Sequence, residues 1–152
     1  MIEIRRDDLT SAAAQALIGA LNADLRARYP GDGSGYFRLD PEEVRPGRGA
    51  FVVAYDAGTP VGCGAVRVID SGVAEIKRMY VLPDLRGRGI ARRMLEALEG
   101  EARSLGVTKL LLETGTRQPE AIALYSKAGF FPTDPYGEYP PSPLNVFFEK
   151  RL

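Results

Sequence analysis

A short segment, Arg86-Gly87-Arg88-Gly89-Ile90-Ala91, combines residue types that bind phosphate groups. Its two glycines can adopt positive φ angles and let a ligand approach the backbone closely. An amphipathic pattern follows it, and the first turn of a helix presents unpaired N–H groups and the positive end of a dipole. The two arginines add positive charge. The segment therefore predicts a binding site for an anionic, nucleotide-like ligand.

Two familiar phosphate-binding loops are excluded by spacing. The Walker pattern ends in Gly-Lys-Ser/Thr, and no such ending is present here. The dinucleotide-binding fingerprint requires a third glycine at the position that Arg92 occupies. The predicted site must therefore bind its ligand in another way.

The chain has no histidine, which limits the proton-transfer chemistry available to it. Ser-His-Asp and Cys-His arrangements are excluded, and a zinc site would lack its commonest nitrogen ligand, so we expect no metal cofactor. A general base must be a carboxylate, tyrosine, lysine or cysteine. The single cysteine, Cys63, lies in an apolar run and is expected to be a buried structural thiol.

The phosphate-binding segment is predicted to connect a strand to a helix. Apolar residues indicate a strand from Ala74 that Pro83 ends, because proline cannot donate a hydrogen bond inside a sheet. The helix shows a buried face with near-helical spacing, opposite a charged face. The buried face comprises Ile90, Met94, Leu95, Leu98, Ala102 and Leu105, and the charged face Arg92, Arg93, Glu96, Glu99 and Arg103.

The rest of the chain alternates strand and helix signals without a repeat or linker, so we expect one domain over residues 1–152. A strand that follows a full helix should pair in parallel with the strand before that helix. The predicted order is a strand at 1–6, a helix from Thr10 or Ser11 to about Tyr29, a loop with a helical turn at 41–43, strands at 50–55, 61–69 and from 74, the helix from 90, a strand at 109–113, a helix at 119–128, and strands from 130 and at 144–150.

Two segments resemble motifs of the Gcn5-related N-acetyltransferase (GNAT) superfamily. Arg86, Gly89 and Ala91 occupy the fixed positions of its acyl-CoA-binding motif, Arg/Gln-x-x-Gly-x-Gly/Ala. The segment from Ala121 to Phe130 is similar to its Ala-x-x-Leu-Tyr-x-Lys-x-Gly-Phe pattern. The resemblance implies an α/β (α+β) GNAT fold, with a central mixed, mostly antiparallel sheet, a splayed parallel pair in its middle and helices on both faces. It also implies acetyl-CoA as cosubstrate.

The resemblance further implies catalytic roles. Glu75 would act as general base, directly or through a water, with Glu113 as the alternative base. The other interpretation of Glu75 is a partly exposed carboxylate paired with Lys77 or Arg78. Tyr125 would act as general acid at the sulfur of coenzyme A, because a phenol is protonated at neutral pH; the alternative is a tyrosine that only packs on the sheet.

Coenzyme A contacts are implied for three segments. A backbone N–H of the strand near Met79 or Val81 would bind the acetyl oxygen and pantetheine, and the N–H groups of the glycine loop would meet the pyrophosphate. Gln118 stands where the family often has asparagine, so its pantetheine contact is either shifted or lost. The expected set is Met79, Tyr80, Val81, Arg86, Gly87, Arg88, Gly89, Ile90, Ala91, Gln118 and Tyr125.

The acceptor is expected to be a primary amine of a small molecule, an amino acid or a peptide, attacking directly in a ternary complex. The segments that are expected to border the acceptor site contain aromatic and acidic residues. The expected contacts are Tyr29, Tyr36, Glu113, Tyr136 and Tyr139, with Phe37 and Asp40 nearby.

The formal net charge is zero, which does not support a general nucleic-acid or membrane partner. The lack of a disulfide framework, of a secretory leader and of a long apolar run favours a cytoplasmic protein. Two alternatives stay open: an acyl-CoA-binding sensor or partner-binding module without catalysis, and a nucleic-acid-binding patch formed by Arg86, Arg88, Arg92 and Arg93. A homodimer through the proline-rich run 140–143 is also considered.

Overall fold

The computed structural model contains one seven-stranded sheet with the strand order β1-β2-β3-β4-β5-β7-β6. It describes residues 1–30, 39–137, 139–140 and 142–152, so the predicted acceptor residue Tyr36 and its neighbour Phe37 lie outside the described residues. β4 and β5 pair in parallel, and the other neighbouring pairs are antiparallel. The strands are β1 (Ile2–Arg6), β2 (Gly49–Asp56), β3 (Thr59–Asp70), β4 (Val73–Val81), β5 (Lys109–Gly115), β6 (Phe131–Pro132) and β7 (Asn145–Arg151).

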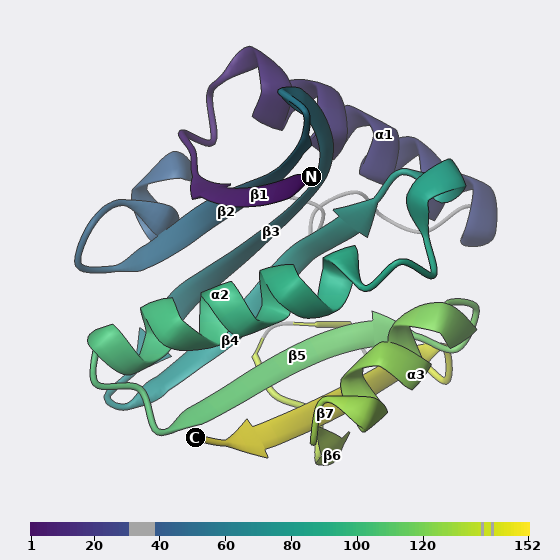
Figure 1. Ribbon diagram of the computed structural model, residues 1–152. Coiled ribbons are helices and arrows are strands. Elements are labelled where there is room, and N and C mark those ends of the chain that lie inside the picture. Colours follow the sequence, from purple (N-terminus) through teal and green to yellow (C-terminus); the bar gives the residue numbers. More distant parts are fainter. Residues whose placement is uncertain (31–38, 138, 141) are drawn as a thin grey trace.

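Helices cover both faces of this sheet, so the predicted fold class is confirmed (Figure 1). α1 (Ala12–Arg28) packs on one face, and α2 (Ile90–Ser104) and α3 (Pro119–Lys127) lie on the other. The predicted helical turn is present as η2 (Pro41–Val44), and a second short turn, η3 (Pro83–Leu85), follows β4. No helix in the described part of the chain is both long enough and apolar enough to cross a membrane.

The continuous apolar run of β2 serves two cores at once. Phe51 and Val53 pack beneath α1, whereas Val52 and Ala54 belong to the cluster that α2 covers. Successive side chains of a strand point to opposite faces, so a run that is apolar throughout predicts burial on both sides.

A bulge interrupts the pairing of β3 with β4. Cys63 pairs with Tyr80 but Ala65 pairs with Lys77, so Gly64 alone faces two residues of β4. Arg78, in the bulge, adopts φ +60°, an uncommon conformation for a residue with a side chain. A Cβ at position 64 would lie 2.5 Å from the Met79 sulfur, so a side chain there would displace that of Met79.

The parallel pairing of β4 with β5 ends just before this bulge. The last pair in register is Ile76 with Leu112, and the two strands diverge beyond it (Figure 1). The residues of β4 from Lys77 to Val81 therefore have no registered partner on β5. The predicted splayed pair is present, and it lies next to the loop that leads into α2.

One prediction about α2 is wrong. The periodicity placed Glu99 on the exposed charged face, but Glu99 is only 6% exposed. Lys150 of β7 donates a hydrogen bond from Nζ to Glu99 Oε1 over 2.7 Å. The charged face of α2 is thus covered in part by the last strand, and a partner 51 residues away neutralises the carboxylate.

We expect Lys150→Met to lower the free energy of unfolding by about 2 kcal/mol, because it leaves the Glu99 carboxylate buried without its cation. Chemical denaturation monitored by circular dichroism measures the change. The matched control is Glu99→Leu combined with Lys150→Met, which removes both charges and should recover most of the loss. A single Lys150→Met variant as stable as the parent would show that the ion pair contributes nothing.

Candidate functional site

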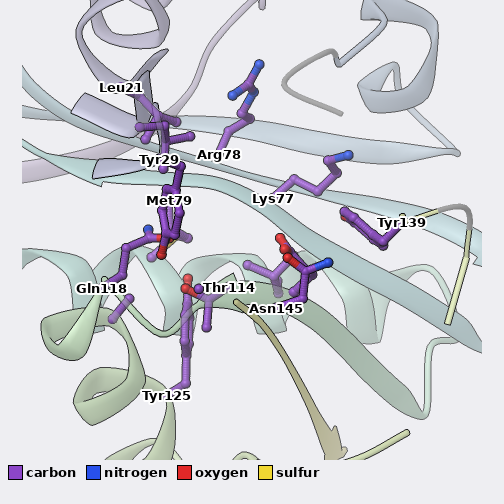
Figure 2. Close-up of a pocket in the computed structure, with 15 residues that line it drawn as sticks. Leu21, Tyr29, Lys77, Arg78, Met79, Thr114, Gln118, Tyr125, Tyr139 and Asn145 are labelled. Carbon is purple, nitrogen blue, oxygen red and sulfur yellow. The ribbon is translucent and has the colours of Figure 1, made fainter. Parts of the chain in front are cut away.

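Two adjoining cavities lie where β4 and β5 diverge. The smaller, about 110 Å³, is bordered by residues of β4 and β5 and by side chains from α1, α3 and the segment before β7 (Figure 2). The larger, about 460 Å³, lies between the end of β4, the glycine loop and α3. We call them the small and the large cavity. They share Leu21, Met79, Gln118, Ala121 and Tyr125.

The large cavity meets the start of α2, and the backbone there suits an anion. Gly87 and Gly89 have φ angles of +81° and +79°, and Gly89 caps the helix without a side chain. The first turn of α2 carries no acidic residue. A Cβ built at Gly89 would meet no atom within 4 Å, so this backbone is open to a ligand. The N–H groups of the first turn are thus available to phosphate oxygens.

Arg86 fixes the glycine loop to β4. Its Nε donates to the Val81 carbonyl oxygen over 3.0 Å, and its guanidinium carbon lies 5.5 Å from the centre of the Tyr80 ring. Arg88 does not border the large cavity. The other residues predicted to contact the cofactor do border it: Met79, Tyr80, Val81, Arg86, Gly87, Gly89, Ile90, Ala91, Gln118 and Tyr125.

Tyr125 stands between the two cavities. The side chain projects from α3, is 6% exposed, and packs edge to face on Phe130 with ring centres 5.7 Å apart. Burial raises the pKa of the Tyr125 phenol, and the nearby Glu113 carboxylate raises it further. The phenol therefore carries its proton at neutral pH and presents a donor to both cavities.

Glu75 is fully buried and borders neither cavity. Arg67 donates from Nε to Oε1 over 2.9 Å, and Oε2 accepts the hydroxyls of Tyr136 and Tyr139 over 2.7 and 2.5 Å. The interpretation of Glu75 as a partly exposed carboxylate paired with Lys77 or Arg78 is therefore wrong. The partner is Arg67, which sequence reasoning missed, although Arg67 lies on the adjacent strand directly opposite Glu75.

The Glu75 network ties the proline-rich segment to the sheet. Arg67 also forms an ion pair with Glu43 of η2, so one guanidinium joins two carboxylates. Tyr136 and Tyr139 pack edge to face on each other and on Phe147 of β7. Burial beside Glu75 raises the pKa of both phenols. Of the two, Tyr139 borders the small cavity, and so connects it to the buried carboxylate.

Tyr29 borders the small cavity and also fastens the end of α1. Its hydroxyl accepts the Arg117 backbone N–H over 3.0 Å and donates to Gln118 Oε1 over 3.2 Å. A Cβ at Gly115 would lie 1.8 Å from this hydroxyl, so glycine is required there. Arg28, beside it, forms ion pairs with Asp24 and Glu120. These contacts hold α1 against the loop between β5 and α3.

The small cavity also has charged side chains that sequence reasoning did not assign to a site. They are Lys77 and Arg78, which border it from β4 (Figure 2). Glu113, the predicted alternative base, borders it from β5. Burial lowers the pKa of the Lys77 ammonium and that of the Arg78 guanidinium. A signal for this role is present in the sequence, since two adjacent cations stand on a strand that is otherwise mostly apolar.

The chain was compared with known proteins. A family model described as the acetyltransferase (GNAT) family matches residues 15–130. A protein of Azospirillum brasilense named IAA acetyltransferase is 42% identical over 152 residues, covering 99% of this chain and 98% of that protein. A Klebsiella pneumoniae structure assigned to the acyl-CoA N-acyltransferases has a TM-score of 0.85 at 35% identity, covering 100% of this chain and 98% of that one.

A more distant structure shares the fold. The PaiA N-acetyltransferase of Thermoplasma acidophilum, solved in complex with coenzyme A, has a TM-score of 0.75 at 19% identity and covers 100% of this chain and 99% of its own. The family match spans most of the sequence, and the Azospirillum relative is similar from end to end. The chain therefore belongs to the acetyltransferase (GNAT) family.

Proposed function

We propose that the protein transfers an acetyl group from acetyl-CoA to the primary amine of a small molecule, by direct attack while both are bound. The observation that carries the proposal is that Tyr125 borders two adjoining cavities, one of which meets the glycine loop. The Azospirillum relative's name includes an acetyltransferase activity, and the Thermoplasma structure contains coenzyme A, which supports the same reaction here.

In this proposal acetyl-CoA occupies the large cavity. Its pyrophosphate meets the N–H groups from Gly87 to Ala91, where the helix dipole and Arg86 favour negative charge. The pantetheine chain runs along Met79 to Val81, the part of β4 that has no partner on β5. The thioester then lies near Tyr125, at the junction with the small cavity.

The proposed chemistry uses the two cavities together. The amine nitrogen attacks the thioester carbonyl carbon, a bond forms between nitrogen and carbon, and the carbon–sulfur bond breaks. The Tyr125 hydroxyl donates its proton to the departing sulfur, so that coenzyme A leaves as a thiol. A backbone N–H of β4 near Met79 polarises the carbonyl oxygen. The amine gives up its proton to a carboxylate on the acceptor side.

Glu113 is the better placed of the two carboxylates for that last step. Glu113 borders the small cavity, whereas Glu75 borders neither cavity and is fully buried. Glu75 reaches the cavity only through the Tyr139 hydroxyl. We therefore propose Glu113 as the proton acceptor and Glu75 as the buried group that positions Tyr139.

The first test is calorimetric titration with acetyl-CoA, followed by thiol release with a panel of amines. Gly89→Val should weaken acetyl-CoA binding by about tenfold or more, because a branched side chain at φ +79° fills the phosphate position. Gly58→Val is the matched control: φ is +88° there, in a turn away from both cavities, and acetyl-CoA binding should be unchanged. Binding without amine-dependent thiol release would favour a non-catalytic acyl-CoA-binding module.

Tyr125→Phe should lower kcat by about 100-fold or more while acetyl-CoA affinity stays near that of the parent, because the variant loses only a hydroxyl. Steady-state kinetics and calorimetry on the same samples separate the two quantities. Thermal unfolding of the variant controls for lost packing against Phe130. Unchanged turnover would remove Tyr125 from the role of acid.

Glu113→Gln and Glu75→Gln should have different effects. Glu113→Gln should lower kcat/KM with little change in Tm, and the deficit should shrink as pH rises toward the amine pKa, where the free amine needs no base. Glu75→Gln should lower Tm, because the variant deprives Arg67 of one buried anion. A Glu113→Gln enzyme with the parental pH profile would contradict the assignment of the base.

A further inference from the structure

Two cations border the small cavity, and no carboxylate in the described residues pairs with either of them. Lys77 and Arg78 are both half-buried, and neither forms an ion pair with a described acidic residue. Three other half-buried cations have carboxylate partners: Arg67 has Glu43 and Glu75, Arg28 has Asp24 and Glu120, and Lys150 has Glu99. Arg86 and Lys109 are half-buried without an ion pair to a described residue, but they are far apart in the sequence. The small cavity is therefore bordered by two adjacent cations that lack an ion pair with a described residue.

One nitrogen atom of the Arg78 guanidinium lacks a hydrogen-bond partner among the described residues. Its Nη1 donates to the side-chain oxygen of Asn22 over 2.8 Å, which is a neutral partner. Its Nε is buried, and among the described residues it has no hydrogen-bond partner. A buried polar N–H without a partner is costly, and a guanidinium more so, because it has lost water around its charge. An anionic group in the adjoining cavity would offset the guanidinium charge by electrostatic attraction, without reaching the buried Nε itself.

We propose that the acceptor is a small amino acid, whose carboxylate binds Lys77 and Arg78 while its amine faces Tyr125 and Glu113. This inference rests on the proposed function. Figure 2 shows Lys77 and Tyr139 toward one end of the small cavity and Gln118 and Tyr125 toward the other. The two charged groups of a free amino acid match this arrangement, because the cavity border has cations and a carboxylate.

Size and charge favour an amino acid over other anions. The cavity measures about 110 Å³, well below the roughly 300 Å³ at which pockets for drug-sized ligands begin. The phosphates of acetyl-CoA are assigned to the glycine loop, which borders the large cavity only. A second phosphate in the small cavity would face Glu113, whereas an ammonium group there would be attracted to it.

The test compares each amino acid with its amide and with the corresponding decarboxylated amine as acceptors, in the parent and in the variants Lys77→Met and Arg78→Met. Parent kcat/KM should be highest for the free amino acid. In either variant the KM for the amino acid should rise about tenfold or more, and the KM for the decarboxylated amine should not rise, since only the carboxylate contact is removed. Arg103→Met, an exposed arginine at the end of α2, is the matched control and should leave both KM values unchanged.

Calorimetry distinguishes failure of this inference from failure of the proposed function. The amino acid is titrated into protein saturated with coenzyme A. If no acceptor is acetylated, amino acid binding that both variants weaken supports the carboxylate site and overturns the transferase activity. Absence of any amino acid binding overturns the site.

The acceptor selectivity of the parent enzyme also tests the amino acid site. Amides, amines or peptides that react as well as free amino acids in the parent would overturn the inference and leave acetyl transfer intact. Thermal unfolding monitors the fold of Arg78→Met, and Lys77→Met provides an independent measurement if that variant is unstable.

Discussion

The divergence of β4 from β5 is the constraint on which the rest of the site depends. In a sheet, backbone N–H and C=O groups are satisfied by the neighbouring strand, and leaving them without partners is costly. Here the registered pairs with β5 stop at Ile76, five residues before β4 ends at Val81. A ligand that lies along the open edge can accept those hydrogen bonds, in the manner of an added strand.

The bulge at Arg78 sets the point at which the strands part. A non-glycine residue at φ +60° costs about 1 kcal/mol, so surrounding contacts must hold it there. Two such contacts are present: Cys63 donates from Sγ to the Arg78 carbonyl oxygen over 3.3 Å, and Asn22 accepts from its guanidinium. β3 and α1 thus hold the conformation of the bulge. The same side chain supplies the uncompensated charge, so strain and buried charge are concentrated in one residue.

The sequence was sufficient for the elements and for the parallel pairing of β4 with β5. Helix and strand periodicity, the Ser11 cap and the crossover rule are local signals, and each predicted element is present. The partners of buried charges could not be predicted in this way. Tyr136 and Tyr139 meet Glu75 across 61 and 64 residues, and Lys150 meets Glu99 across 51. Periodicity tells which face of an element a residue occupies, but it does not tell which distant side chain covers that face.

In the candidate site, too, residues in local motifs were predictable and residues placed by distant contacts were not. The glycine loop could be anticipated from its strand–loop–helix order, and Tyr125 from its resemblance to a GNAT motif; both border the large cavity. Lys77 and Arg78 were considered only as partners for Glu75, because their relation to the small cavity depends on a bulge that no local signal predicted. Tyr29 was expected beside the acceptor, and its second contribution, the fastening of α1 to the loop before α3, arises from contacts 88 and 89 residues apart.

The thiol that supports the bulge has a practical consequence. Cys63 is the only cysteine of the chain and is fully buried, and burial raises the pKa of its thiol to about 12. Chromogenic disulfide reagents react with thiolates, so in native protein they would detect free coenzyme A with little background from the enzyme. A label that does attach at Cys63 would report that β3 and β4 had separated at the bulge. Cys63 therefore adds little thiol signal to enzyme assays, and its labelling reports local opening of the sheet.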